Sequence, residues 1–278
     1  MNNLKKITKH LAILSIFLLG IGTPISTQAD NVMPNQTDTY QNLANQDYQS
    51  GNQAYDILNN DQPETITNGN FQQSKIEYSN LDNYNRAGTA TAYLTKDNLG
   101  KSKGRASQIF KPTGWNNQAK KINGERVFPV NRGHLIAYTF SFNLDQSGKY
   151  NKGEKGSIDN PKNLFTQSAF SNQKIMQITE DSVRDALSAN KKVIYQVTPI
   201  YRGNDLMARG VWVQAISTDG SLHFDRYLYN VQPGLAFNYA NGRSVIDGTM
   251  TVPNPPEKTS AKKYKSTSHR KKYTKHYY

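Results

Sequence analysis

The chain has 278 residues, which is enough for one large or two small domains with a substantial hydrophobic core. It contains no cysteine, so disulfides, thiolate metal sites and a cysteine nucleophile are excluded. Its 34 Lys and Arg against 21 Asp and Glu give a net charge of +13, which favours nucleic acid or another polyanion as a partner. Residues 257–278 contribute +7 and residues 1–29 contribute +3, so residues 30–256 carry only +3.

Residues 1–29 are predicted to be a secretory signal peptide. Three lysines between positions 5 and 9 precede an apolar run over residues 11–21, and residues 26–29 offer small side chains for cleavage. The apolar run is shorter than the roughly 18–20 residues that a membrane span needs. We therefore expect a secreted, extracellular protein, with an uncleaved N-terminal anchor at the cell surface as the alternative.

Composition divides the rest of the chain into three parts. Residues 30–70 are rich in Asn, Gln, Asp and Thr and are predicted to form a polar flexible leader, because they bury too little apolar surface to offset their ordering entropy. The folded domain is expected over residues 71–252. Residues 253–278, which turn to Lys, Tyr, Ser, Thr and His after a proline-rich start, are predicted to be a basic disordered tail.

The predicted domain combines strands with one prominent helix. Residues rich in Val, Ile and Tyr predict strands, glycine and proline clusters predict loops, and an apolar stripe at steps of three and four predicts the helix. In chain order we expect a strand over 90–94, loop-rich chain over 100–114, an extended run over 127–130, a long loop over 143–160, a helix over 167–189, a strand over 191–200 and a hairpin over 211–229 with Asp219-Gly220 as its turn. The predicted fold class is α+β with a mixed or antiparallel sheet.

Only two of the five histidines, His134 and His223, belong to the predicted domain. His223 lies on the expected polar face of its strand, which favours a structural role. His134 follows Arg132 and Gly133 at the end of a short strand, where a glycine lets the backbone approach a ligand closely. Spacing alone supports a functional and a structural role for His134 equally.

The predicted helix carries a pair of oxygen donors. Asn172 lies near its start and Glu180 follows eight residues later, so the two are about 80° apart around an α-helix and can face one cleft. Carboxamide and carboxylate oxygens are ligands that Mg²⁺ accepts while keeping several of its waters. The alternatives are that Asn172 caps the helix and that Glu180 is a solvated surface charge.

Asn131-Arg132-Gly133-His134 belongs to an ordered series of segments within residues 76–245. Its other members are Leu81-Asp82-Asn83, Arg86-Ala87-Gly88-Thr89-Ala90, Gly114-Trp115, Asn160-Pro161-Lys162-Asn163, Phe170-Ser171-Asn172-Gln173 and Val183-Arg184-Asp185-Ala186-Leu187. This series resembles the DNA/RNA non-specific endonucleases with a ββα-metal core, the streptococcal-type secreted and surface nucleases in particular. The tetrapeptide alone would be a weak signal, and the ordered series is a strong one.

The resemblance implies a role for each matching residue. His134 would be the general base that activates a water for attack on phosphorus, Asn172 the direct ligand of a Mg²⁺ ion, with Mn²⁺ as an alternative, and Glu180 a holder of that ion's water. Arg132 and Arg184 would offset the charge of the transition state.

Three further residues are assigned lesser roles by the same resemblance. Asn163 would support the site and Lys162 would bind substrate. The family motif begins with Asp where this chain has Asn131. The lost carboxylate either weakens metal affinity or leaves Asn131 with a structural hydrogen bond, and we do not interpret it as inactivation.

The predicted function is therefore a secreted, sugar-non-specific endonuclease that hydrolyses DNA, and RNA as well, through contacts with the backbone. The alternative is a non-catalytic module that binds DNA or another polyanion and is attached to the cell wall by its tail. A phosphodiesterase for small nucleotides fits the long loops and basic balance less well. The tail could bind anionic cell-wall polymers, extend the grip on DNA or only solubilise the chain, and no protein partner is evident.

Overall fold

The computed structural model describes residues 34–256, with side chains from residue 38 onward. The predicted signal peptide and residues 257–278 of the predicted tail lie outside this range. Within it, no helix combines the length and the apolar character needed to cross a membrane.

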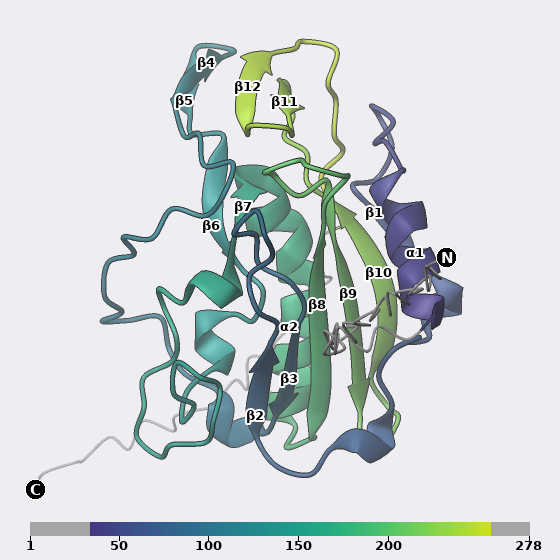
Figure 1. The fold of residues 1–278 in the computed structure, drawn as a ribbon, viewed down its shortest axis with the longest axis vertical. Coiled ribbons are helices and arrows are strands. Elements are labelled where there is room, and N and C mark those ends of the chain that lie inside the picture. The colour runs from purple at the N-terminus through teal and green to yellow at the C-terminus, as the bar shows by residue number, and fades with distance from the viewer. Residues whose placement is uncertain (1–33, 257–278) are drawn as a thin grey trace, which may run out of the picture. The chain divides into compact units, whose positions relative to one another are not determined.

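A six-stranded sheet, in the order β1-β10-β9-β8-β3-β2, forms the centre of the fold, and all of its pairs are antiparallel (Figure 1). Its strands are β1 (Tyr55–Ile57), β2 (Lys75–Tyr78), β3 (Ala90–Leu94), β8 (Val193–Ile200), β9 (Gly210–Ser217) and β10 (His223–Tyr229). The predicted strand over 90–94 and the predicted hairpin are confirmed. Gly220 has a φ of +71° at the hairpin turn, a conformation that glycine adopts without strain.

Two strands and a helix, here called the ββα unit, lie beside this sheet. Strand β6 (Val130–His134) pairs antiparallel with β7 (Leu164–Ser168). The chain then passes through a π-helical turn (Ser171–Ile175) into helix α2 (Met176–Ser188). The predicted helix therefore starts too early, because residues 164–168 are a strand in which every residue is buried.

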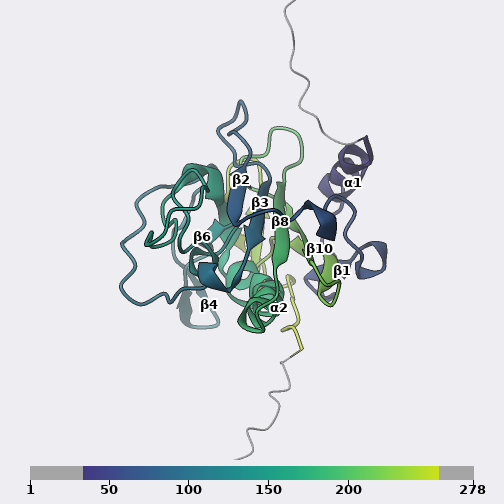
Figure 2. The same cartoon turned by 90° about the horizontal axis from the view of Figure 1, so that it is seen from below.

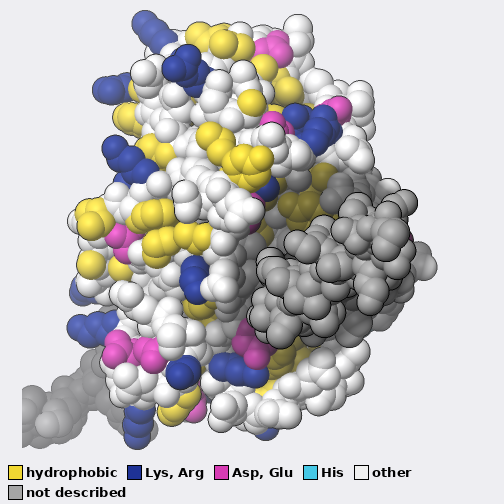
Figure 3. Space-filling model, viewed as in Figure 1, with side chains coloured by type: hydrophobic (Ala, Val, Ile, Leu, Met, Phe, Trp, Pro, Cys, Tyr) yellow, Lys and Arg dark blue, Asp and Glu magenta, His cyan; other side chains and the backbone are white. Residues whose placement is uncertain are grey.

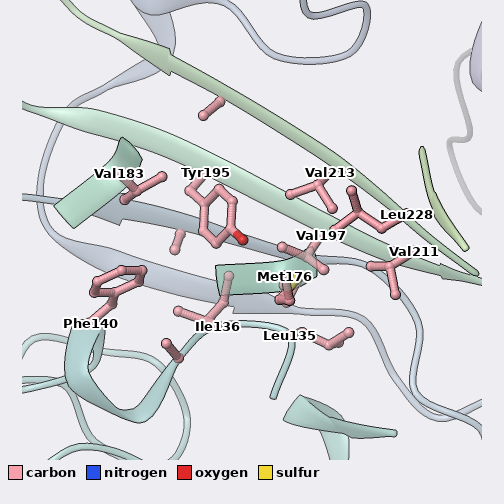
Figure 4. Packing of buried hydrophobic residues seen from close by; sticks show 14 of the residues in the cluster. Leu135, Ile136, Phe140, Met176, Val183, Tyr195, Val197, Val211, Val213 and Leu228 are labelled. Atoms are coloured by element: carbon pink, nitrogen blue, oxygen red, sulfur yellow. The ribbon is translucent and has the colours of Figure 1, made fainter. Parts of the chain in front are cut away.

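Helices α1 (Pro34–Ala44) and α2 cover opposite faces of the sheet (Figure 2). Alternation along β9 explains this arrangement, since Val211 and Val213 join the cluster of α2 while Trp212 joins the cluster of α1. Figure 4 shows the larger cluster, in which side chains of α2 pack between the sheet and the segment that follows β6. This packing fixes β6 and α2 relative to each other, and these two elements carry the predicted site residues.

The prediction of a flexible leader over residues 30–70 is wrong for the described part of that segment. Strand β1 pairs with β10, and Leu43 and Ala44 of α1 are each only 2% exposed. The segment is short of large aliphatic side chains, but the sheet face that it covers supplies the apolar surface. The loop after β8 also satisfies its backbone, because Arg202 Nε donates to the Ala44 carbonyl at 2.6 Å.

Two small hairpins complete the described region, and they lie together at one end of the molecule in Figure 1. They are formed by β4 (Lys120–Ile122) with β5 (Glu125–Val127), and by β11 (Leu235–Asn238) with β12 (Arg243–Ile246). The predicted long loop over 143–160 is confirmed, since it contains neither helix nor strand and only one isolated bridge, between Leu144 and Tyr150.

Candidate active site

An open cleft of about 810 Å³ lies between β6, α2 and the loop-rich segment over 102–117. Six of the predicted site residues line it: Asn131, Arg132, His134, Asn172, Glu180 and Arg184. The fold therefore brings together residues that are separated by up to 53 positions in the chain.

Gly133 has a different role from the one expected. A Cβ atom at this position would lie 2.7 Å from the Cβ of Gln167 and 2.9 Å from a ring carbon of Phe165. The missing side chain therefore lets β7 pack closely against β6, and it is not a point where a ligand approaches the backbone. Close packing of the two strands sets the position of His134 at the end of β6.

The imidazole of His134 is held by a backbone carbonyl. Its Nε2 lies 3.1 Å from the Ile158 oxygen, so Nε2 carries the proton and Nδ1 is left as an acceptor. The pKa of His134 is lowered to about 4, mainly by burial and also by the positive charge of Arg105, although the Ile158 carbonyl and Asp159 act in the opposite direction. The ring is therefore neutral at neutral pH.

Asn172 and Glu180 approach the cleft from the turn that opens α2 and from the helix itself. Asn172 lies in the π-helical turn, where hydrogen bonds span five residues and the α-helical 100° step does not apply. Burial raises the pKa of Glu180 to about 7, with Arg184 lowering it and Asp181 raising it. Neither the Asn172 amide nor the Glu180 carboxylate makes a hydrogen bond to another residue of the described range.

This donor set fits a hydrated divalent ion. Glu180 is half-buried and desolvation disfavours its charged form, so a cation beside it would stabilise the carboxylate. Among residues 34–256 no group of three or more His, Asp or Glu could enclose a metal. An ion here would take few protein ligands and keep most of its waters, as Mg²⁺ usually does. Mn²⁺ also accepts oxygen donors and could take its place.

Two arginines are fixed on aromatic rings at the wall of the cleft. Arg132 donates from Nε to the Phe110 carbonyl at 2.5 Å, and its guanidinium lies 4.7 Å from the centre of the Trp115 ring. Arg184 donates to Thr139 Oγ1 at 3.0 Å and lies 4.7 Å from the centre of the Phe140 ring. Each guanidinium keeps nitrogens that bond to no other described residue, so each can bind an anion in the cleft.

The remaining predicted residues differ in placement. Asn163 is fully buried outside the cleft, where its side chain accepts from the Ile136 N–H and donates to the Ile136 carbonyl, both at 2.9 Å. It thus fixes the chain just beyond His134. Lys162 does not line the cleft, and its Nζ instead donates to Asn80 Oδ1 at 2.8 Å. His223 is exposed and contacts Gln62, which agrees with a structural role.

Asn131 lines the cleft but makes no side-chain hydrogen bond to the residues that the structure describes. The structural hydrogen bond considered for Asn131 is therefore not formed. Its amide therefore faces the cleft and is available to a bound ligand.

Several lining residues were not predicted. They are Ser102, Arg105, Gln108, Trp115, Asn117, Gln173, Lys174 and Gln177. Lys174 could have been found from its place beside Asn172. Arg105 carries no local signal, because it lies in a loop that only tertiary contacts bring to the site.

Basic side chains also project at the upper left in Figure 3, where Figure 1 places β4 and β5. This edge continues from the cleft, since Asn117 and Val130 both line the cleft and flank the β4–β5 hairpin in sequence. The surroundings of the cleft therefore favour an anionic ligand.

The fold and the site together define a protein of the ββα-metal class. The sequence model of the family described as DNA/RNA non-specific endonuclease matches residues 63–219, and the chain belongs to this family.

Similar proteins agree with this assignment. The chain is 26% identical to a deoxyribonuclease of Streptococcus dysgalactiae subsp. equisimilis, over 64% of this chain and 63% of that protein, so it spans less than two thirds of that relative. The crystal structure of NucA from Streptococcus agalactiae with magnesium bound is 28% identical, with a TM-score of 0.62 over 77% of this chain and 96% of that one. A structure of Sda1 nuclease with bound zinc is 24% identical, with a TM-score of 0.55 over 70% and 97%, and supports the fold.

Proposed function

We propose that the protein is a secreted, metal-dependent endonuclease that hydrolyses phosphodiester bonds of DNA, and of RNA as well. The observation that carries this proposal is the meeting of His134, Asn172 and Glu180 in one cleft walled by arginines. The deoxyribonuclease name of a relative and the magnesium in the NucA structure support it.

His134 acts as the general base. With Nε2 donating to the Ile158 carbonyl, Nδ1 takes a proton from the attacking water, and the carbonyl then stabilises the imidazolium that forms. A pKa of about 4 keeps the ring neutral at neutral pH, so Nδ1 is available to accept the proton.

Arg132 and Arg184 bind the phosphate and offset the negative charge that grows during attack. Their stacking on Trp115 and Phe140 holds each guanidinium in place before substrate arrives, which lowers the entropy cost of orienting it.

The Asn172 amide oxygen would hold the metal directly, and the Glu180 carboxylate would hold its bound water. Mg²⁺, or Mn²⁺ in its place, supplies Lewis-acid stabilisation of the charge on the reacting phosphate when bound. Asn131 has its amide in the same cleft and is a further neutral oxygen donor there.

Recognition through phosphates explains why one cleft serves both nucleic acids. The arginines of the site bind the phosphate backbone, which DNA and RNA share. Binding to phosphates displaces counterions, so affinity should fall as the salt concentration rises.

The direct test is digestion of supercoiled plasmid and of a structured RNA with Mg²⁺, with Mn²⁺ and with EDTA. We expect cleavage with either metal and none with EDTA. His134→Ala should lose at least about 100-fold in rate at an unchanged melting temperature, as expected for removal of a general base. His223→Ala is the matched control, because this exposed histidine lies outside the cleft. Full activity of His134→Ala would refute the catalytic assignment.

Asn172→Ala separates affinity from chemistry. Loss of one ligand of a hydrated ion should raise the metal concentration needed for half-maximal rate, with activity partly regained at high Mg²⁺. A metal dependence equal to that of the unmodified protein would rule Asn172 out as a ligand.

The basic segment over 257–278 is proposed to extend the surface that binds nucleic acid. Asn254, Pro255 and Pro256 line a pocket together with Lys174 and Gln177 of the cleft rim, so the chain leaves the described region beside the cleft. The charge of +7 that follows more than doubles the +3 of residues 30–256.

Removing residues 257–278 tests this role. For each phosphate that the segment neutralises on duplex DNA, its removal should lower the slope of log affinity against log salt by about 0.9. An unchanged slope would mean that the segment does not bind DNA. Its role would then be to bind anionic cell-wall polymers, which a cell-wall pull-down measures, or to keep the chain soluble. If binding persists while no metal supports cleavage, the non-catalytic polyanion-binding module is the better description.

Export is proposed from the first 29 residues alone. We expect the protein in the culture supernatant with an N-terminus near Asp30. Recovery of the intact N-terminus with the membrane fraction would favour the anchored form.

A further inference from the structure

A single loop segment, residues 108–110, contacts the surroundings of both His134 and Arg132. Gln108 lines the cleft, and each of the three residues makes a hydrogen bond to Ile158 or Asp159. No sequence signal marks this segment, which has neither helix nor strand.

The first contact concerns the acceptor of His134. The Ile158 carbonyl, 3.1 Å from His134 Nε2, also accepts from Gln108 Nε2 at 3.0 Å. One carbonyl oxygen therefore joins the loop segment to the imidazole.

The second contact is made by the next residue in the chain, Asp159. Its carboxylate accepts from the backbone N–H of Phe110, at 2.9 Å from one oxygen, and from that of Ile109 at 3.2 Å. Hydrogen bonds to a charged acceptor are about twice as strong as neutral ones, so Asp159 is the main anchor of the segment.

The third contact reaches Arg132. The carbonyl of Phe110, whose N–H is held by Asp159, accepts from Arg132 Nε at 2.5 Å. Arg132 and His134 are two residues apart on β6, so the contacts form a closed ring from His134 through Ile158, Asp159 and Phe110 back to Arg132.

We propose that Asp159 is a positioning residue that sets the orientation of His134 and Arg132 together. This inference rests on the proposed nuclease function. Asp159 touches neither residue by a hydrogen bond and acts through the backbone on either side of it. Without its carboxylate, Asp159 no longer links the Phe110 backbone to the chain at Ile158. The carbonyls that accept from Arg132 and His134 are then less firmly positioned.

The variants are chosen to isolate this role. Asp159→Ala removes both acceptor oxygens, whereas Asp159→Asn keeps one and should restore part of the effect. Asp145→Ala is the matched control, because Asp145 also accepts two backbone N–H groups, from Ser147 and Lys149 at 2.8 and 3.0 Å, in the same long loop but away from the cleft.

The expected result is a loss of about 100-fold in kcat for Asp159→Ala, with KM changed less than about threefold, since a displacement near 1 Å at a reacting group costs about that much. Asp159→Asn should lie between Asp159→Ala and the unmodified protein, and Asp145→Ala should match the unmodified protein. In an Arg132→Ala background Asp159→Ala should cost clearly less than it does alone, because part of its effect passes through Arg132.

A second measurement does not depend on cleavage. Nitrogen-15 NMR of the His134 ring should show one tautomer, protonated at Nε2, in the unmodified protein and a mixture in Asp159→Ala. A single Nε2 tautomer together with unchanged kcat in a folded Asp159→Ala variant would overturn the proposal. If the unmodified protein does not cut nucleic acid, the nuclease function fails, and the tautomer alone decides the inference.

Discussion

Two titratable groups of the cleft, His134 and Glu180, have pKa values displaced in opposite directions, and this predicts how metal binding depends on pH. Burial places the pKa of His134 at about 4 and that of Glu180 at about 7 in the metal-free protein. As pH falls from 8 to 6, Glu180 takes up a proton and loses the charge that attracts a cation. His134 stays neutral over the same range, so of these two groups only Glu180 should respond.

The size of the effect follows from the pKa of Glu180. Proton competition at a pKa of about 7 weakens apparent Mg²⁺ affinity about tenfold between pH 8 and pH 6, whereas an ordinary Glu would change it by only about 3%. At saturating Mg²⁺ the rate should be nearly constant across this range, because the ion displaces the proton.

The assay is the initial rate of cleavage of a short fluorescent duplex, titrated with Mg²⁺ at pH 6, 7 and 8 and constant ionic strength. Mn²⁺ binding followed by electron paramagnetic resonance gives the same affinity without turnover. Glu180→Gln is the control, and its affinity should be weaker and independent of pH. An apparent affinity that changes less than about twofold in the active, unmodified protein would refute the reasoning.

Three predictions concern stability. Gly133→Ala should lower the free energy of unfolding by about 1–3 kcal/mol in urea denaturation, because the new methyl group meets the buried Gln167 and Phe165; a neutral result would mean that β6 and β7 can separate. Leu43→Ala should lower the free energy of unfolding by about 2–5 kcal/mol, because α1 packs into the core. An unchanged melting temperature would instead mean that residues 34–47 are a flexible leader. Asp225 is fully buried with a pKa raised to about 7 by burial, so its stabilising neutral form is lost as pH rises toward and through 7. Asp225→Asn should raise the melting temperature at pH 8 and flatten its pH dependence, and a lower melting temperature at pH 8 would contradict this.

Local patterns predicted the elements whose own residues determine them. β3 was predicted at its observed bounds, and β8 to β10 followed from their β-branched and aromatic content. The resemblance of the ordered segments singled out His134, Asn172 and Glu180, which line one cleft, whereas spacing alone left a structural role open for each of them. The helix pattern also placed Asn172 and Glu180 on one side, although the turn between them is not α-helical.

The errors have a common physical cause, which is that another part of the chain supplies the missing interactions. Helix α1 has a weak apolar face, and the opposing sheet compensates for it. Arg105 reaches the cleft because Asp159 anchors the loop that follows it, a contact across about 50 positions that no local pattern reveals. Gly133 was assigned to ligand approach, whereas its neighbour is the adjacent strand.

Because of the π-helical turn, the direction of the side chains before it is set separately from the direction of those in α2. Beyond the turn, Met176, Thr179 and Val183 keep a regular spacing into the core, while Asn172 before it is set by a wider winding. Deleting one residue from 173–175 would leave a regular α-helix and rotate Asn172 by about 100° relative to the buried stripe. A single inserted residue is therefore enough to turn an amide toward the cleft without repacking the core, so the cleft-facing and core-facing surfaces of this helix can vary separately in related sequences.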